Sequence, residues 1–465
     1  MNNFKFSKSY YLLNLIFLLE RTAWFILIIQ IPIFIAQKNV GGLGFTQETK
    51  GIIYLYWVLL QNSLPLFTGN LIDSSTNKKS LILISCIILF LAFLSIGFYQ
   101  NIIGLLIGIT LVSIGVSIFN PLMKGQIGLQ IRRQNASMGW GLHFWLYNFA
   151  IFIIGVPYST YLREISWEYV FVGAGILYLI AFLLTFFYKS EEQQFVHKTK
   201  ILDNLKGSLE IFKRGDNYIL LISMSGFAVL FMQFYETLPN FIYDWSDTSS
   251  IVNSIGLSEV FTSETWSGQG ISFEWLYNIN TGLTLLLLLP FSIYLKKYHT
   301  ITSLFAGVLL ATLGFGLSIL NQNGIFLIAG FSVYTVGELI TNPKYTEYFD
   351  FVSNQYEKST HMGLLFISNL IGYPIGALLG GFMYGNYGEK SSLAQKYLLE
   401  NFSLQSSLND AFQIMSIKMN MNEIELTRFL WEEYNPTLSF IPFLVIGMIS
   451  LVGILIFRNR INQNR

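Results

Sequence analysis

Four charged residues lie inside stretches that are otherwise apolar: Glu20, Arg21, Glu236 and Glu338. An unpaired charge inside a membrane costs at least a few kcal/mol, so such residues normally face a polar interior and pair with one another. Arg21 can hold one carboxylate ionised, whereas a carboxylate with poorer pairing takes up a proton more readily. Such protonation would release the arginine and switch the chain between two arrangements. The alternative is a permanent ion pair that only joins helices.

Other chemistry-bearing patterns are absent from the sequence. There is no Ser-His-Asp set, no glycine-rich phosphate loop and no pair of cysteines, since Cys86 is the only one. The four histidines have no metal-ligand spacing: His143, His197, His299 and His361. We therefore expect no enzyme activity, no metal and no cofactor.

The composition indicates which elements must position these charges. Of 465 residues, 53% are hydrophobic and only 12% are charged, far below the roughly 25% of soluble domains. The net charge of +1 gives no reason to expect a nucleic-acid partner. Uncharged runs of membrane-spanning length predict an all-α membrane protein with twelve transmembrane helices. The predicted spans are 10–36, 51–72, two within 80–123 divided at Gln100-Asn101, 136–162, 169–188, 217–243, 275–295, 300–320, 325–349, 362–387 and 436–457.

The basic residues predict the orientation of these spans. Twenty of the 28 Lys and Arg residues lie in segments that would share one side of the membrane, and seven lie in segments on the other side. Because basic loops stay cytoplasmic, we expect both termini inside a bacterial-type inner membrane. This assignment counts Lys344, at the end of the span 325–349, with the inside residues. It leaves Arg21 as the one basic residue in the membrane and places Lys50 in an outside loop.

Two of the outside segments are too long to be simple connections. Residues 244–274 are acidic and rich in Gly, Ser and Thr, which predicts an irregular insertion. Residues 388–435 alternate polar and apolar residues at helical spacing, which predicts short amphipathic helices outside the membrane or at its surface. A soluble binding module is the alternative for this second insertion.

A weak internal repeat organises the chain. Gly115 is followed after four residues by Asn120-Pro121, and Gly337 by Asn342-Pro343, at an offset of 222 residues. This repeat predicts two six-helix halves, residues 1–188 and 217–465, joined by a basic cytoplasmic linker, residues 189–216. In such proteins the solute site lies between the halves near the middle of the membrane.

These features together resemble the major facilitator superfamily. Twelve spans arranged as six plus six and a basic central loop fit that family, as does Gly69-x-Leu71-x-Asp73 followed by Lys78 after the second span. Where the family motif has a basic residue and a second glycine, this chain has Ser74 and Thr76. The resemblance implies that Gly69, Asp73 and Lys78 form a cytoplasmic latch.

Within that superfamily, the motifs resemble those of proton-coupled oligopeptide transporters. The resemblance rests on the following segments and residues: Phe17-x-x-Glu20-Arg21-Thr-Ala-Trp24-Phe25, Asn148, Tyr235-Glu236-Thr237, Asn280…Pro290 and Gly337-Glu338-Leu339…Pro343. Two positions depart from the pattern, because Phe17 replaces a glutamate and Asn120 replaces a lysine. In the family these two positions serve proton coupling and carboxylate binding, so a peptide substrate does not follow from the resemblance.

We therefore predict a secondary transporter that moves a small polar solute, with peptides among the candidate solutes, by alternating access. It is expected to be coupled to protons and to work as a monomer in the lipid bilayer. The expected residues fall into two groups. Arg21, Trp24, Asn120, Asn148 and Asn280 contact the solute, and Glu20, Glu236, Glu338 and Lys124 serve coupling and gating. The alternatives are an uncoupled facilitator or exporter of another solute, and a sensor or scaffold that has lost transport.

Overall fold

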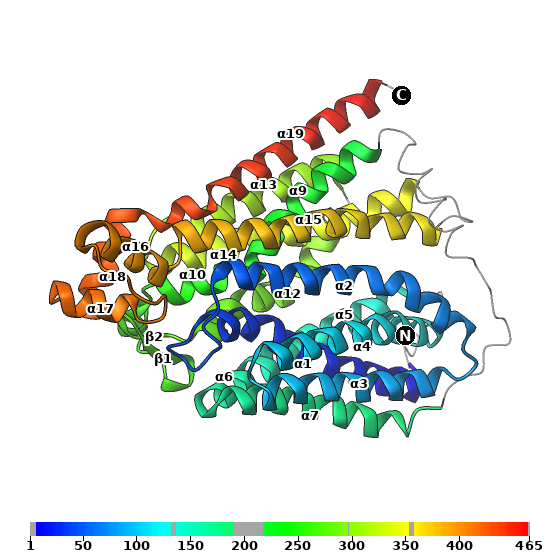
Figure 1. Cartoon of the computed structure of the whole chain (residues 1–465). Helices are drawn as coiled ribbons and strands as arrows, with labels where there is room; N and C mark the ends of the chain where they lie inside the picture. The colour runs from blue at the N-terminus through cyan, green and yellow to red at the C-terminus, as the bar shows by residue number, and fades with distance from the viewer. Residues whose placement is uncertain (1–5, 132–135, 190–216, 296, 353–357, 464–465) are drawn as a thin grey trace. The chain divides into compact units, whose positions relative to one another are not determined.

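The structure is a computed structural model of the whole chain, shown in Figure 1. It describes residues 6–131, 136–189, 217–295, 297–352 and 358–463. Long helices dominate, and they begin and end as follows: α1 Lys8–Ala36, α2 Gln47–Ser74, α3 Lys78–Phe98, α4 Ile102–Leu129, α5 Ala136–Ala150, α6 Val156–Ile165, α7 Trp167–Thr185, α9 Asn217–Glu236, α10 Leu238–Trp245, α12 Phe273–Leu295, α13 Thr300–Ser318, α14 Gly324–Val352, α15 Lys358–Tyr387 and α19 Ile441–Gln463.

Each of the twelve predicted spans coincides with helix in the structure, which confirms the all-α prediction. Among the described residues, nine stretches are long and apolar enough to cross a membrane. Helices α2, α12 and α15 occupy the other three predicted spans. The predicted division at Gln100-Asn101 is confirmed, because the Asn101 side chain accepts hydrogen bonds from the first turn of α4. The predicted linker falls mostly on residues 190–216, which lie outside the described residues.

The chain divides into two compact units. Unit 1 comprises residues 1–30 and 56–206, and unit 2 comprises residues 31–55 and 207–465. The end of α1 and the first turns of α2 thus group with the second unit. The interactions of these segments with α9, α10 and α15 are consequently internal to unit 2.

In unit 1, α3 packs against both α4 and α7, as Figure 1 shows. Pro121 lies inside α4 and has no amide hydrogen, so it cannot bond to the carbonyl one turn earlier, at Ser117. The Thr68 hydroxyl of α2 donates to that carbonyl at 2.8 Å. A proline in α4 therefore provides a polar contact to α2 within the same unit.

The repeat has a packing counterpart in each unit. A Cβ on Gly115 of α4 would lie 2.5 Å from Leu89 of α3, and one on Gly337 of α14 would lie 2.3 Å from the Ala311 backbone of α13. Gly108 and Gly330, also 222 residues apart, lie equally close to α3 and α13. Gly330 and Gly337 let α14 approach the backbone of α13, as small residues do in membranes, whereas Gly108 and Gly115 make room for side chains of α3.

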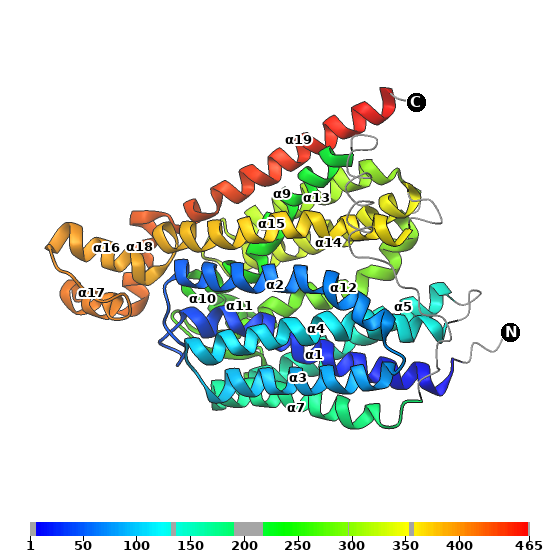
Figure 2. The same ribbon diagram turned by 45° about the vertical axis from the view of Figure 1, so that its right-hand side comes forward.

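Unit 2 is built around α9. This helix packs against α15 and α19, while α14 packs against α13 and α12; Figure 2 shows α9 and α15 side by side from a second direction. The seventh span was predicted as one helix over 217–243, but α9 ends at Glu236 and α10 begins at Leu238. Pro239 at the start of α10 lacks the amide hydrogen that a continuous helix requires, which explains the break after Glu236.

The first insertion is ordered, so the prediction that residues 244–274 are irregular was wrong. It contains α11 (Ser249–Ile255), the 3-10 turn η4 (Glu259–Phe261) and the antiparallel strands β1 (Thr262–Thr265) and β2 (Gly268–Ile271). Gly268 follows Ser267 with φ +102°, a conformation that favours glycine and closes the hairpin. The Gly, Ser and Thr residues of this segment therefore lie in a short helix and a hairpin as well as in turns.

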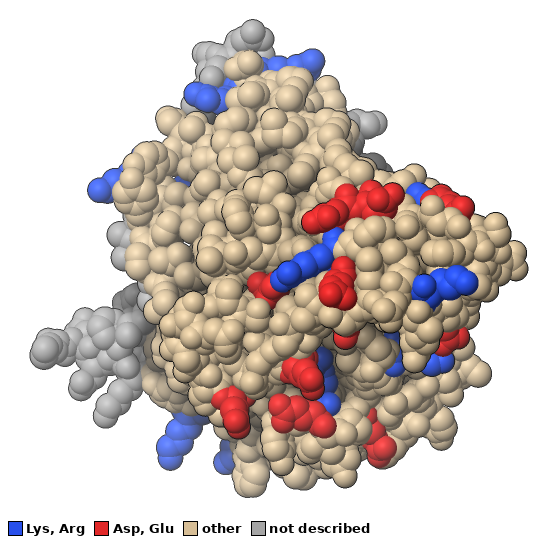
Figure 3. All heavy atoms as spheres, turned by 90° about the vertical axis from the view of Figure 1, so that its left-hand side faces the viewer, with Lys and Arg blue, Asp and Glu red and all other residues tan. Residues whose placement is uncertain are grey.

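The second insertion forms the predicted amphipathic helices. We call α16 (Lys390–Phe402), α17 (Ala411–Met419) and α18 (Glu423–Tyr434) the α16–α18 module. A short turn, η5 (Pro436–Phe440), connects it to α19. One side of each helix is buried, through residues such as Leu393 and Leu398 of α16, Met415 of α17, and Leu426 and Leu430 of α18, while Leu399 and Ile417 are exposed. Figure 3 shows the side of the structure that carries this module, where charged side chains lie on the surface among uncharged residues.

Candidate functional site

In unit 1, Arg21 is paired with its neighbour in α1. Its Nε and Nη2 atoms donate to the two oxygens of Glu20, each at 2.5 Å, and Glu20 is fully buried. The guanidinium also lies over two rings, 4.9 Å from the centre of Trp24 and 5.5 Å from that of Phe17. This bidentate ion pair fixes the orientation of the guanidinium plane and neutralises its charge.

Unit 1 also contains buried polar atoms with spare hydrogen-bonding capacity. The Trp24 indole N–H and the Asn120 amide oxygen are buried and have no hydrogen-bond partner among the described residues. The Asn148 amide donates at 2.9 Å to the Phe144 carbonyl of its own helix. Lys124 is close enough to Glu20 and Arg21 to interact with both electrostatically. Because unpaired buried polar atoms are costly, Trp24 and Asn120 are suited to receive a polar solute.

In unit 2, Glu338 and Asn280 come together from different helices. The Asn280 amide of α12 donates to Glu338 Oε2 of α14 at 3.0 Å and to the Thr335 hydroxyl at 3.0 Å. Asn342, one turn further along α14, donates to the other Glu338 oxygen at 3.4 Å. The sequence singled out Asn280 and Glu338 separately, and the structure places them in contact.

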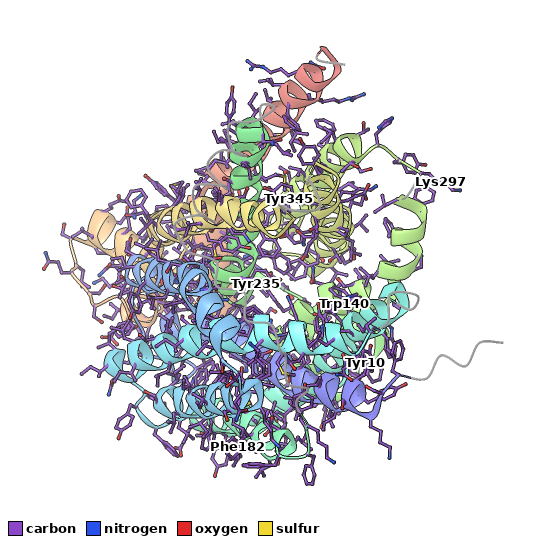
Figure 4. The ribbon with its side chains drawn as sticks, turned by 90° about the vertical axis from the view of Figure 1, so that its right-hand side faces the viewer. Tyr10, Trp140, Phe182, Tyr235, Lys297 and Tyr345 are labelled. Carbon is purple, nitrogen blue, oxygen red and sulfur yellow. The ribbon has the colours of Figure 1, made fainter. Side chains whose placement is uncertain are left out.

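Tyrosines from three helices surround this carboxylate. Tyr235 of α9, Tyr334 of α14 and Tyr373 of α15 are all close enough to Glu338 to interact with it electrostatically. Tyr235 is labelled in Figure 4 on α9. The Tyr334 hydroxyl is buried and has no hydrogen-bond partner among the described residues. The site thus combines one carboxylate, two amides and three tyrosines, a set that suits a positively charged group.

Glu236 has a partner that sequence reasoning missed. Lys50 is fully buried in the first turn of α2, and its Nζ lies 3.9 Å from Glu236 Oε1 and donates to the Glu236 carbonyl at 2.9 Å. Gly380 of α15 makes room for this carboxylate, because a Cβ there would lie 2.6 Å from Glu236 Oε2. The placement of Lys50 in a loop was therefore wrong, and Arg21 is not the only buried basic residue. The available signal was that Lys50 directly precedes an uncharged helical run.

The predicted latch is described only in part. Lys78 is buried at the start of α3, and its Nζ donates to the Ile72 carbonyl at the end of α2. Gly69 lies within α2, and the side chain of Asp73 lies outside the described residues. The structure thus shows a Lys78 bond that joins the end of α2 to the start of α3.

A further buried charged cluster lies where α10 meets α16, outside the spans. Glu389 accepts a hydrogen bond from Gln47 of α2 at 2.9 Å, and Asp244 accepts one from the Lys390 backbone amide. Burial raises the pKa of Glu389 to about 7 and lowers the pKa of Lys390 to about 8. The groups that face Glu389 are Gln47 and Lys50 of α2, Asp244 of α10 and Ser392 of α16.

This cluster predicts a pH-dependent stability. Because the folded pKa of Glu389 is about 7 against an ordinary 4.5, its ionisation destabilises the fold as pH rises through that window, by at most about 3 kcal/mol. Glu389→Gln, which stays neutral, is expected to gain stability relative to wild type between pH 5 and pH 8. Thermal unfolding at both pH values measures this gain. The control is Glu400→Gln, an exposed position in α16. An equal difference at both pH values would contradict the prediction.

A bundle of long apolar helices with buried ionisable groups in both units defines a polytopic membrane transporter. The sequence profile of the Major Facilitator Superfamily matches residues 13–343, and the chain belongs to this superfamily. That membership confirms the predicted family and fold. It also confirms the prediction of a transporter rather than an enzyme.

The curated relatives of the chain include transporters of more than one description. The multidrug resistance protein MdtH of Aeromonas hydrophila is 22% identical over 75% of this chain and 82% of its own length. An uncharacterised MFS-type transporter of Bacillus subtilis, YttB, is 22% identical over 57% of this chain. This chain covers 62% of the length of YttB.

Solved structures share the fold over nearly the whole chain. A peptide transporter POT crystallised with sulfate has a TM-score of 0.72 at 14% identity, covering 100% of this chain and 96% of that one. A structure of the nucleoside transporter NupG has a TM-score of 0.66 at 14% identity, covering 98% and 99%. These similarities show the fold, and the solutes named for the similar proteins differ from one another.

Proposed function

We propose that the chain is a proton-coupled secondary transporter that moves a small polar solute bearing a protonated amine across a bacterial inner membrane by alternating access. The observation that carries the proposal is the Glu338 carboxylate, which accepts a hydrogen bond from Asn280 and interacts electrostatically with Tyr235, Tyr334 and Tyr373. A carboxylate with oriented oxygens binds an ammonium by charge-assisted hydrogen bonds, and aromatic faces add cation–π attraction.

The N-terminal residues are proposed to contact the remainder of the solute. Glu20 accepts from two of the five N–H groups of the Arg21 guanidinium, so the other three are proposed to donate to a solute. The unpaired Trp24 N–H and Asn120 oxygen suit a neutral polar group, and Asn148 is proposed to line the same region. Small amines and peptides with a free amino group both carry the ammonium that the Glu338 site is proposed to bind, so both are among the solutes to test.

Proton coupling is proposed for the buried carboxylates. Glu236 is matched to the buried Lys50, and Glu20 to Arg21, so protonation of either carboxylate would release a cation inside the protein. Lys124 is proposed to respond to the Glu20–Arg21 pair. Gly69, Asp73 and Lys78 are proposed as a latch at the cytoplasmic end of α2.

A proton-driven exporter of cationic compounds is the second candidate. The multidrug resistance proteins among the relatives favour it. The two candidates differ in direction and not in the chemistry of the Glu338 site. Transport assays in both membrane orientations separate them.

A ligand screen tests the solute class. Di- and tripeptides, nucleosides and cationic amines are added to the purified protein, and each amine is compared with its N-acetylated counterpart. A solute that binds only the folded protein stabilises it by about 2.7 kcal/mol at a hundredfold excess over its Kd. We expect amines to raise the melting temperature and their acetylated forms not to. Stabilisation by neutral or anionic solutes alone would contradict the amine assignment.

The proposed orientation predicts where a cysteine reagent can react. Asn401 is exposed in α16, which the distribution of basic residues places outside. In a Cys86→Ala background, a cysteine at Asn401 is expected to react with an impermeant maleimide on intact cells. Reaction only after permeabilisation would reverse the proposed topology.

A further inference from the structure

The α16–α18 module begins with a lysine enclosed by aromatic rings. Lys390 is buried, and its Nζ lies 5.6 Å from the ring centre of Trp245, 5.2 Å from that of Trp266 and 5.3 Å from that of Phe412. The three rings come from α10, from the turn between β1 and β2, and from α17. One side chain thus fastens three elements that are distant in sequence, through contacts typical of ammonium recognition.

Hydrogen bonds next to this cage continue into α10. The Trp245 indole N–H donates to the Gly388 carbonyl at 2.8 Å. The Asp244 carboxylate accepts from the Tyr384 hydroxyl of α15 at 2.7 Å and from Gln37 at 3.0 Å. The start of the module, residues 388–390, is therefore hydrogen-bonded to α10, the short helix that follows Glu236.

The start of the module and the end of α15 are also hydrogen-bonded to the first turn of α2. Gln47 donates to Glu389, and Asn386 at the end of α15 donates to Glu48 at 3.1 Å. Gly51 of α2 and Gly381 of α15 lie backbone to backbone, since a Cβ on Gly381 would lie 3.0 Å from the Gly51 Cα. The turn that these contacts hold is the one that carries Lys50.

We propose that the α16–α18 module is a brace that holds the first turn of α2 against α9, so that Lys50 stays paired with Glu236, and that Lys390 and Glu389 are its fastening residues. Lys390 and Glu389 are positioning residues. Lys390 acts through α10 and Glu389 acts through Gln47, and neither belongs to the Lys50–Glu236 pair itself. The importance of that pair for transport rests on the proposed function, whereas the mechanical link does not.

The test measures amide hydrogen exchange in the intact protein and needs no solute. Lys390→Glu places a carboxylate among ring faces and near Asp244, and Glu389→Ala removes the acceptor for Gln47. Each is expected to speed exchange of the amides of residues 51–55 at least about fivefold, because these amides bond within the first turns of α2. The matched controls are Lys396→Glu and Glu400→Ala, both at exposed positions of α16, and they are expected to leave these rates within twofold of wild type.

Two results would overturn the brace. One is faster exchange confined to residues 390–434 with residues 51–55 unchanged, which would make the module an appendage. The other is an equal effect of the exposed control variants. Failure of the proposed function leaves the exchange result intact, because exchange reports the link without transport. Either of these two results combined with working transport would remove only the brace and leave the proposed function standing.

Discussion

Glu338→Gln is expected to abolish accumulation of solute driven by a pH gradient while partly retaining exchange of solute across the membrane. Glutamine has the size of glutamate and can still accept a hydrogen bond from Asn280, but it cannot ionise or carry a proton. The coupling step is therefore lost. The shape of the site is kept, but the ammonium binds more weakly without its charged partner, so exchange is retained only in part. The measurement is uptake into proteoliposomes with an imposed pH gradient, beside counterflow at equal pH.

The control for this variant is Glu347→Gln in the same helix. Glu347 lies two turns further along α14, where its exposed carboxylate pairs with Lys344. It is expected to transport as wild type does. If Glu338→Gln still concentrates solute on the gradient as well as wild type, Glu338 is not the coupling site, and coupling would then rest with Glu20 or Glu236.

Arg21→Lys is expected to lose transport although the positive charge is kept. Lysine cannot bond both oxygens of Glu20 in one plane, nor can it stack on Trp24 as a guanidinium does. Arg21→Ala is expected to be worse, because it leaves the fully buried Glu20 unpaired and destabilises the fold by about 3–5 kcal/mol. Uptake into proteoliposomes and thermal unfolding measure the two effects separately.

The exposed Arg458, near the end of α19, provides the matched control. Arg458→Lys is expected to change neither uptake nor melting temperature. Wild-type uptake by Arg21→Lys would assign the Glu20–Arg21 pair a purely structural role. In that case the lost stability of Arg21→Ala would be its only consequence.

The spans could be predicted because each is a long run of one physical property. Twenty apolar residues without charge must form helix in a membrane, where every backbone group needs an internal partner. The break between α9 and α10 after Glu236 could not be predicted from hydrophobicity, because the residues on both sides of the break are apolar. Only Pro239 marked it. The hairpin of residues 262–271 was missed because short strands within a Gly-, Ser- and Thr-rich segment carry little periodic signal.

The candidate site could be predicted as a set of residues but not as a set of contacts. Glu338 stood out because a charge within a span is rare, and Asn280 through its family resemblance. That Asn280 bonds Glu338 depends on how α12 packs on α14, which no local pattern encodes. Lys50 was missed for a similar reason. A lysine at the start of a helix is ordinarily solvated, and only the fold places it beside Glu236.

The most direct test of the account is solute accumulation by the wild-type protein in proteoliposomes under a controlled pH gradient. The solute is the amine that stabilises the protein best in the ligand screen. Imposing a pH gradient is expected to drive that amine against its own concentration gradient, and a protonophore is expected to release it. Equal uptake with and without the pH gradient would contradict proton coupling, and the absence of any movement of the amine would contradict the proposed transport of amines.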